Sequence, residues 1–147
     1  MDLKFPYQVK VKLPSDLEYI PSIRKFVSEV LQVSGFSSKF AFRSEIIVDE
    51  ICNNAINYGN ENKGDSEVEL ICEIHEERIE LLVKDEGGNS VHTERLKQAV
   101  KSNEGTENEN QLGLEIVKML SEKIDLKIDE KNNVTSIHVI RKREKAK

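Results

Sequence analysis

The chain has 147 residues, of which 37% are apolar and 33% are charged, a composition that predicts one globular domain over residues 1–147. No stretch approaches the ~18 consecutive apolar residues of a membrane span. The first residues also lack the basic and apolar regions of a signal peptide, so we expect a cytoplasmic protein with no membrane partner. The net charge of −5 repels phosphate backbones and argues against a direct nucleic-acid partner.

The first part of the chain predicts a strand followed by two helices. Apolar and polar residues alternate over residues 5–13, as in a half-buried strand. Residues 15–18 (Ser-Asp-Leu-Glu) have the capping-box pattern of a helix start, and Gly35 is a candidate for that helix's C-cap. A second helix is expected from about Ser38 to Tyr58. The apolar stripes expected on the two helices are Ile20, Ile23, Phe26, Val27, Val30 and Leu31, and then Phe42, Ile46, Ile47, Ile51 and Ala55.

The remaining residues predict two hairpins separated by a polar segment. Alternating residues over 67–84 indicate two strands joined at Glu76-Glu77. Residues 86–111 have few apolar side chains beyond those of one short helix, so we expect a functional lid or a disordered insertion there. A further helix should open right after Gly113. The last hairpin is expected to comprise strands 124–128 and 135–139 around a turn at 131–133.

The order of these elements indicates the fold class. It runs strand, helix, helix, strand, strand, lid, helix, strand, strand. Because strands and helices do not strictly alternate, we expect an α+β protein. Its architecture would be a two-layer sandwich with the helices on one face of a mixed, mostly antiparallel sheet.

The cysteines and histidines are given structural interpretations. Cys52 and Cys72 fall in apolar periodic segments and are expected to be small buried thiols rather than a disulfide. His75 and His92 are interpreted as exposed loop residues, and His138 as a surface residue of a strand. None has a neighbour at zinc-ligand spacing.

One face of the second helix combines a carboxylate with carboxamides. At about 100° per residue, Glu50, Asn54 and Asn57 fall within a narrow arc. The carboxylate can accept a proton or orient a hydroxyl group, and an amide oxygen can ligate Mg²⁺. A solvated helix face would also carry asparagines, although asparagine is a poor helix former.

Two glycine-containing segments could contribute to the same site. In Asp85-Glu86-Gly87-Gly88 the aspartate can accept a hydrogen bond from an exocyclic amine, and the glycines let the backbone pass close to a flat ligand. A plain turn would have the same composition. Gly113, at the expected mouth of a helix, offers backbone N–H groups to phosphates, although an ordinary loop-to-helix junction explains it equally well.

Taken together, these motifs resemble those of the Bergerat-fold ATPase and kinase superfamily. The chain is most similar to its small single-domain members, the anti-sigma factor serine/threonine kinases of sporulation and general-stress switches. Glu50-x-x-x-Asn54-Ala55-Ile56-x-x-Gly59 resembles their N-box, and Asp85-x-Gly87 their adenine-binding motif. The segment 112–117 (Leu-Gly-Leu-Glu-Ile-Val) resembles their second glycine box.

The resemblance implies ATP and Mg²⁺ as ligands and gives each motif a role. Asn54 would hold Mg²⁺ on the ATP phosphates, and Glu50 would activate the acceptor hydroxyl group. Asp85 would bind the adenine amino group, and Gly87 would admit the base. The remaining implied contacts are backbone N–H groups of Gly113 and Leu114 to the phosphates and a hydroxyl group near the adenine from Thr135, or from Ser136 if the register differs by one.

Three departures from the family pattern bear on catalysis. Gln111 occupies the position of the first glycine in the second box, and Tyr58 stands where many relatives have histidine. The part of the lid around residues 102–110 contains no lysine or arginine, and Lys101 at its edge is the nearest candidate cation. These changes affect nucleotide binding less than phosphoryl transfer.

By resemblance, the function is that of an ATP-binding anti-sigma regulatory serine/threonine kinase. It would phosphorylate an anti-sigma-factor antagonist, a STAS-type protein, and when unopposed would sequester a sigma factor. The family also suggests a homodimer. The alternative is a non-catalytic module of the same fold in which ATP controls protein binding, and a third possibility is an α+β protein that binds no nucleotide.

Overall fold

The computed structural model describes residues 5–59, 67–86, 109–129 and 134–143. None of the helices in these segments is both long and apolar enough to cross a membrane. In chain order the elements are β1 (Tyr7–Pro14), the 3₁₀ turn η1 (Leu17–Tyr19), α1 (Ile20–Val33), α2 (Ser38–Gly59), β2 (Glu67–Ile74), β3 (Arg78–Glu86), α4 (Glu109–Leu120), β4 (Lys123–Asp129) and β5 (Val134–Lys142).

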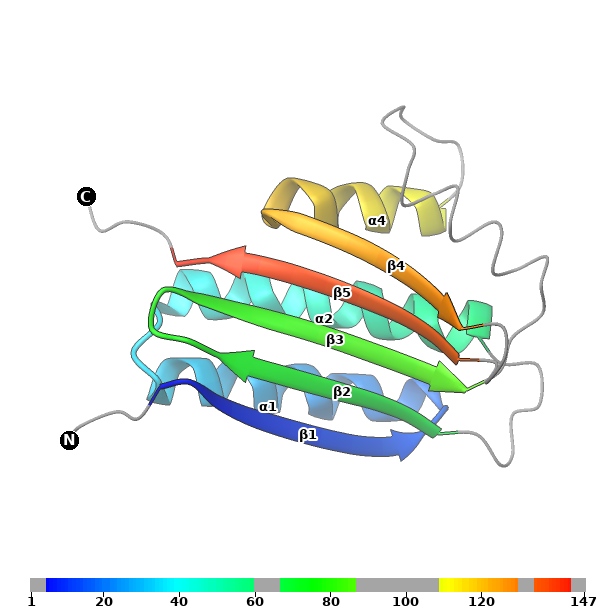
Figure 1. Ribbon diagram of the computed structural model, residues 1–147, viewed down its shortest axis with the longest axis horizontal. Helices are drawn as coiled ribbons and strands as arrows, with labels where there is room; N and C mark the ends of the chain where they lie inside the picture. Colours follow the sequence, from blue (N-terminus) through cyan, green and yellow to red (C-terminus); the bar gives the residue numbers. More distant parts are fainter. Residues whose placement is uncertain (1–4, 60–66, 87–108, 130–133, 144–147) are drawn as a thin grey trace.

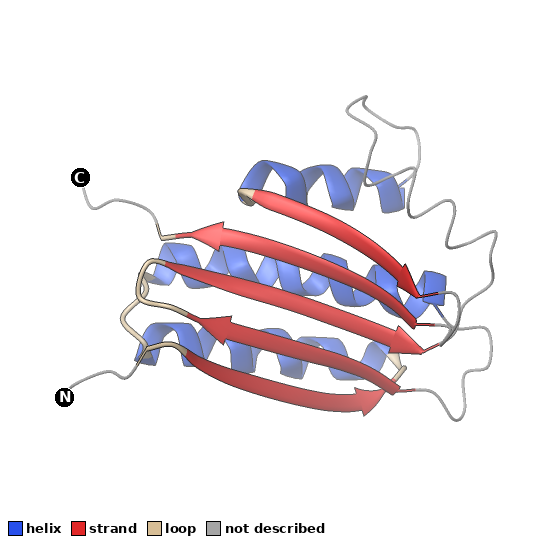
Figure 2. Cartoon of the chain, in the orientation of Figure 1, coloured by secondary structure: helices blue, strands red, loops and turns tan. Residues whose placement is uncertain are grey.

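The strands form one sheet whose order is β1-β2-β3-β5-β4. The three helices lie on one face of this sheet (Figure 1), so the molecule has one helical and one β layer (Figure 2). The predicted α+β class and layering are therefore confirmed. All four pairings of the described strands are antiparallel, so the parallel pair that a mixed sheet would contain is not found among them.

The core lies between the helices and the sheet. Alternate residues of each central strand point toward the helices, as in β3, where Ile79, Leu81 and Val83 are buried. The helices contribute the opposing apolar surface, with Ile47 and Ile51 of α2 fully buried. Both predicted hairpins are present as antiparallel pairs, β2 with β3 and β4 with β5. The turn expected at 131–133 lies outside the described residues.

The ends of the first helix differ partly from the sequence prediction. The predicted capping box is wrong in detail, because Asp16 rather than Ser15 caps the 3₁₀ turn, and the Asp16 carboxylate accepts a hydrogen bond from the N–H of Glu18. The C-cap at Gly35 is confirmed, since its φ is 93°. The N–H of Phe36 donates to the carbonyl of Leu31 at 3.0 Å, which satisfies a terminal carbonyl of the helix.

Two predicted core residues lie on the surface. Phe26 of α1 is 43% exposed and Phe42 of α2 is 61% exposed. A helix that covers only one face of a sheet buries only part of its circumference, and both phenylalanines fall outside that part. On α2 the stripe instead includes Val48 and Cys52, both buried.

Both cysteines are buried free thiols, as expected. Burial raises the pKa of Cys52 to about 12, with smaller contributions from Cys72 and Asp49. Burial alone raises the pKa of Cys72 to about 12. Because the thiolate is the reactive form, neither group is suited to nucleophilic chemistry.

Candidate functional site

Glu50 and Asn54 lie one turn apart in the C-terminal half of α2. Asn54 is only 2% exposed, so it does not lie on a solvated helix face, which was the alternative interpretation of the sequence. Its Nδ2 donates a hydrogen bond of 2.7 Å to the backbone oxygen of Glu50. This bond orients the side chain and makes Oδ1 the atom that can ligate a cation. The side chain of Asn57, the third residue of the predicted arc, lies outside the described part of the chain.

Gly113 of α4 lies directly against the carboxylate of Glu50. A Cβ atom placed on Gly113 would be 1.9 Å from Glu50 Oε2 and 2.6 Å from its carboxyl carbon. Any side chain at this position would therefore collide with the carboxylate. Glycine here leaves room for the Glu50 carboxylate in its observed position, independently of any phosphate contact.

The start of α4 corrects one part of the sequence prediction. The helix begins at Glu109, so the expectation that it opens right after Gly113 is wrong. The first four N–H groups of a helix, counted from its N-cap, have no intrahelical acceptor, and in the described part of α4 they belong to residues 109–111. Gly113 and Leu114 follow in the next turn, and Leu114 is fully buried.

Asp85 lies at the end of the buried row of β3. Its side chain follows Val83 on the helix-covered face and is only 1% exposed. Hydrogen bonds to a carboxylate are strong in such surroundings, where water screens little. The position suits an acceptor for a ligand amine.

The register of β5 identifies the residue opposite Asp85. Thr135 is the Cα partner of Asp85, whereas Ser136 is opposite Lys84. Cross-strand partners share a face of the sheet, so Thr135 rather than Ser136 has the register that the adenine contact would need. The side chain of Thr135 is outside the described residues, as are Gly87 and most of the predicted lid, 86–111. Their roles stay predictions.

The elements that carry these residues meet at one end of the molecule. The C-terminal ends of α2 and β3 and the N-terminal ends of α4 and β5 lie there together (Figure 1). The carboxylate and carboxamide of α2 and the buried carboxylate of β3 are thus held around one region. Such a set can hold a hard cation, bind an amine and accept a proton.

The electrostatic surroundings of Glu50 favour a proton acceptor. Burial raises the pKa of Glu50, and the neighbouring Asp49 carboxylate raises it further. Asp49 itself accepts a hydrogen bond of 3.3 Å from Arg24 Nη1 on α1. A raised pKa increases the affinity of this carboxylate for a proton, as a general base requires. Sequence reasoning missed the Arg24–Asp49 pair because the two residues are on different helices. The only signal in the sequence was that Asp49 and Glu50 are adjacent acids, whose repulsion a positive partner would reduce.

Comparison with known proteins gives a family and several similar proteins. Residues 13–139 match the model of a histidine kinase-like ATPase domain. Three similar proteins are each named serine-protein kinase RsbW. One, from Bacillus velezensis, is 33% identical over 81 residues, which are 54% of this chain and 49% of that protein.

The other two similar proteins align over more of the chain. The protein from Bacillus licheniformis is 27% identical over 125 residues, 82% of this chain and 78% of that protein. The one from Staphylococcus epidermidis is 26% identical over 144 residues, 91% of this chain and 87% of that protein. The chain therefore spans about half the length of the Bacillus velezensis relative and most of the other two.

Proposed function

Because the chain belongs to the histidine kinase-like ATPase domain family, we propose that it is an ATP-binding serine/threonine-protein kinase that uses Mg-ATP. The observation that carries this proposal is the contact between Gly113 and Glu50, since Glu50 lies one helical turn before the buried Asn54. The names of the similar proteins point to the same activity. We treat residues 1–147 as a single kinase-like domain with a lid at about 86–111.

Asn54 and Glu50 have separate roles in this proposal. Asn54 Oδ1 holds Mg²⁺, which neutralises charge on the ATP phosphates. The amide fits this role because its Nδ2 is already bound to the helix backbone. Glu50 accepts the proton of the acceptor hydroxyl group while the hydroxyl oxygen forms a bond to the γ-phosphorus. The bond between the γ-phosphorus and the bridging oxygen breaks, and ADP leaves with the electrons of that bond.

The nucleotide is held by residues at the same end of the sheet. Asp85 accepts a hydrogen bond from the adenine amino group, with Thr135 opposite it in the register and Gly87 beside the base. The phosphates lie at the N-terminus of α4, near Gly113 and Leu114. In the described part of α4, the backbone N–H groups of residues 109–111 are the ones that the helix does not use.

The substrate and partners follow from the same resemblance. We propose that the acceptor is a STAS-type anti-sigma-factor antagonist and that the chain sequesters a sigma factor in the cytoplasm when the antagonist is absent. The names of the similar proteins support a protein substrate that carries serine. A homodimer stays a prediction.

Phosphoryl transfer from labelled Mg-ATP to a STAS-type antagonist tests the proposal. Asn54→Ala should abolish Mg-dependent ATP binding. Glu50→Gln should keep ATP affinity but lower transfer by about 10²-fold or more, because only the proton acceptor is removed. Glu45→Gln removes another carboxylate of α2 and serves as the matched control.

The outcomes separate the kinase from the alternative module. ATP binding without transfer in the wild-type chain would favour a non-catalytic module in which nucleotide controls protein binding. Transfer at the wild-type rate by Glu50→Gln would contradict the role of Glu50. Unchanged ATP affinity in Asn54→Ala would contradict the site itself.

A further inference from the structure

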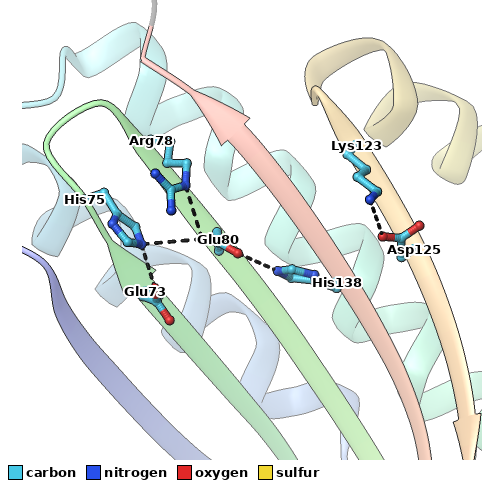
Figure 3. Close-up of polar contacts among 7 residues, drawn as sticks. All are labelled: Glu73, His75, Arg78, Glu80, Lys123, Asp125 and His138. Atoms are coloured by element: carbon cyan, nitrogen blue, oxygen red, sulfur yellow. Dashed lines mark hydrogen bonds and ion pairs between the residues drawn. The ribbon is translucent and has the colours of Figure 1, made fainter.

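Two carboxylates and two imidazoles converge on the sheet face that the helices do not cover (Figure 3). We call Glu73 and His75 of the β2–β3 hairpin, Glu80 of β3 and His138 of β5 the His-Glu cluster. His75 Nε2 lies 2.6 Å from Glu73 Oε1 and 3.4 Å from Glu80 Oε2. His138 Nε2 lies 3.0 Å from Glu80 Oε1. The two oxygens of Glu80 therefore face different imidazoles.

The cluster has an excess of negative charge. Glu73 and Glu80 are Cα partners across the hairpin, an arrangement in which like charges destabilise a sheet. Arg78 Nε donates to Glu80 Oε2 at 3.2 Å. A divalent cation held between the two carboxylates would replace this repulsion with attraction.

The donor atoms suit a transition metal better than Mg²⁺. One donor atom from each of Glu73, His75 and Glu80 lies within 4.8 Å of the others. Bonds of about 2.0–2.2 Å in a tetrahedral zinc site place donor atoms about 3.4 Å apart. The 3.4 Å between His75 Nε2 and Glu80 Oε2 already has this value. A mixed imidazole and carboxylate set is typical of Zn²⁺ and its first-row neighbours.

The cluster is also accessible to an ion from solvent. The side chains of His75 and Glu80 are 18% and 20% exposed, and those of His138 and Glu73 are 31% and 42% exposed. The groups are thus held by their neighbours but not sealed. Small rotations of Glu73 and of Arg78 would open the space between the three donor atoms.

We propose that Glu73, His75 and Glu80 bind one divalent transition-metal ion, for which Zn²⁺ is the representative. His138 acts as a positioning residue that holds Glu80 Oε1, as partners behind metal ligands commonly do. The ion links β2 to β3 and stabilises the folded chain by binding only to it. This site is separate from the proposed nucleotide site, because Glu80 and Asp85 point to opposite faces of β3.

The sequence held a signal for this site that the separate interpretation of each histidine missed. Glu73 and His75 are two residues apart, the spacing that places side chains on one face of an extended segment. His75 directly follows β2 and is largely buried rather than an exposed loop residue, because its side chain packs between Glu73 and Glu80. The pairing of β2 with β3, which brings in Glu80, depends on the tight turn at Glu76-Glu77.

Calorimetric titration of the untagged chain with Zn²⁺ tests the proposal. The titration is made without nucleotide and in excess Mg²⁺, so that a hard-cation site contributes nothing. We expect one Zn²⁺ per chain with a dissociation constant in the micromolar range or below. His75→Gln and Glu73→Gln should each weaken binding by about tenfold or more, and His138→Gln by about tenfold. Zn²⁺ should raise the thermal midpoint of the wild-type chain by several degrees.

Glu69→Gln is the matched control for Glu73→Gln. Glu69 lies on the same face of β2, where its carboxylate is 3.9 Å from Lys12 Nζ and outside the cluster. This variant should bind Zn²⁺ like the wild-type chain. Absence of saturable binding up to millimolar Zn²⁺ would overturn the proposal. Equal affinity in the wild-type chain and in folded His75→Gln, checked by circular dichroism, would overturn it as well.

Discussion

Gly113 occupies a helical position at which glycine is unfavourable. Glycine in a helix interior costs about 1 kcal/mol relative to alanine. The contact with Glu50 explains its presence, because a Cβ atom would lie 1.9 Å from the carboxylate oxygen. The blocking atom belongs to the end of a flexible side chain. The carboxylate can therefore move away without disturbing the backbone of either helix.

Gly113→Ala should for this reason separate stability from activity. We expect the free energy of unfolding to stay unchanged or rise by up to about 1 kcal/mol. Transfer should fall by about tenfold or more, because a displaced Glu50 is no longer aligned with the acceptor. Denaturant unfolding and a transfer assay measure the two effects.

Gly35→Ala provides the contrasting glycine variant. At a φ of 93° alanine is strained, so this change should destabilise the fold by about 1 kcal/mol and leave the transfer rate of the folded protein intact. A wild-type transfer rate in Gly113→Ala would show that the position of the Glu50 carboxylate does not matter.

The raised pKa of Glu50 predicts a pH-dependent stability difference. The folded chain binds this proton more tightly than the unfolded chain, so the stabilisation from protonated Glu50 is full at low pH. It is lost as the pH rises from the ordinary value of 4.5 through the folded pKa. Glu50→Gln stays neutral and should be more stable than the wild-type chain at pH 7.

Denaturant titrations between pH 4 and pH 8 measure this difference. The stability gap between Glu50→Gln and the wild-type chain should narrow as the pH falls. A gap that is constant with pH, or one of opposite sign at pH 7, would mean that Glu50 is not held in a setting that disfavours its charge.

At the residue scale, the sequence predicts which side chains share a helix face better than it predicts which side chains of different helices are in contact. The spacing of Glu50 and Asn54 identifies a shared helix face because helical periodicity is a local property. The contact of Gly113 with Glu50 joins residues 63 positions apart and depends on how two helices pack. Only the structure supplies that information.

At the scale of elements, Arg141 joins three of them. Its Nη1 donates to the carbonyl of Phe40 at 2.7 Å and to Ser44 Oγ at 3.0 Å, both on α2. Its Nε donates to the carbonyl of Leu120 at 2.9 Å, the last residue of α4. The guanidinium carbon also lies 4.0 Å from the centroid of the Phe40 ring. Arg141 as a whole is only 4% exposed. It therefore supplies a hydrogen-bond donor to the carbonyl of the last residue of α4.

Arg141→Met should destabilise the chain strongly. Removing the guanidinium takes the Nε donor from the carbonyl of Leu120, whereas the carbonyl of Phe40 keeps its hydrogen bond from Ser44 Oγ, so we expect a cost of about 1–3 kcal/mol. Denaturant unfolding measures the loss, and Lys142→Met, at the exposed neighbouring position, is the control. A loss no larger than that of the control would refute the linking role of Arg141.

The elements themselves were largely predictable, and their edges were not. The β2–β3 hairpin follows from the alternation of apolar and mostly polar residues on both sides of a two-residue turn. The start of α4 was misplaced by several residues because Glu109 and the polar residues after it extend a helix without apolar periodicity. Phe26 and Phe42 were misassigned because periodicity gives a helix face but not the width that the sheet covers.

At the scale of the whole molecule, the two faces of the sheet have different chemistry. The covered face packs against the core, and its row of buried β3 side chains ends in Asp85. This end of β3 is close to the C-terminal end of α2 and the N-terminal end of α4 (Figure 1). The uncovered face carries the His-Glu cluster near the β2–β3 turn (Figure 3). Composition and element order were enough to predict the two layers. The strand order β1-β2-β3-β5-β4, which places Thr135 opposite Asp85, required long-range pairing.

The central claim is that this end of the molecule binds Mg-ATP, and an ATP titration by calorimetry tests it most directly. The wild-type chain should bind ATP in the micromolar range with Mg²⁺ and more weakly without it. Asp85→Asn should lose at least tenfold in affinity, because the neutral amide keeps only one acceptor oxygen and loses the negative charge that strengthens the hydrogen bond from the adenine amine. Asp125→Asn, in an ion pair with Lys123 on β4, should bind normally. No ATP binding at millimolar concentration, or equal affinity in Asp85→Asn, would contradict the claim.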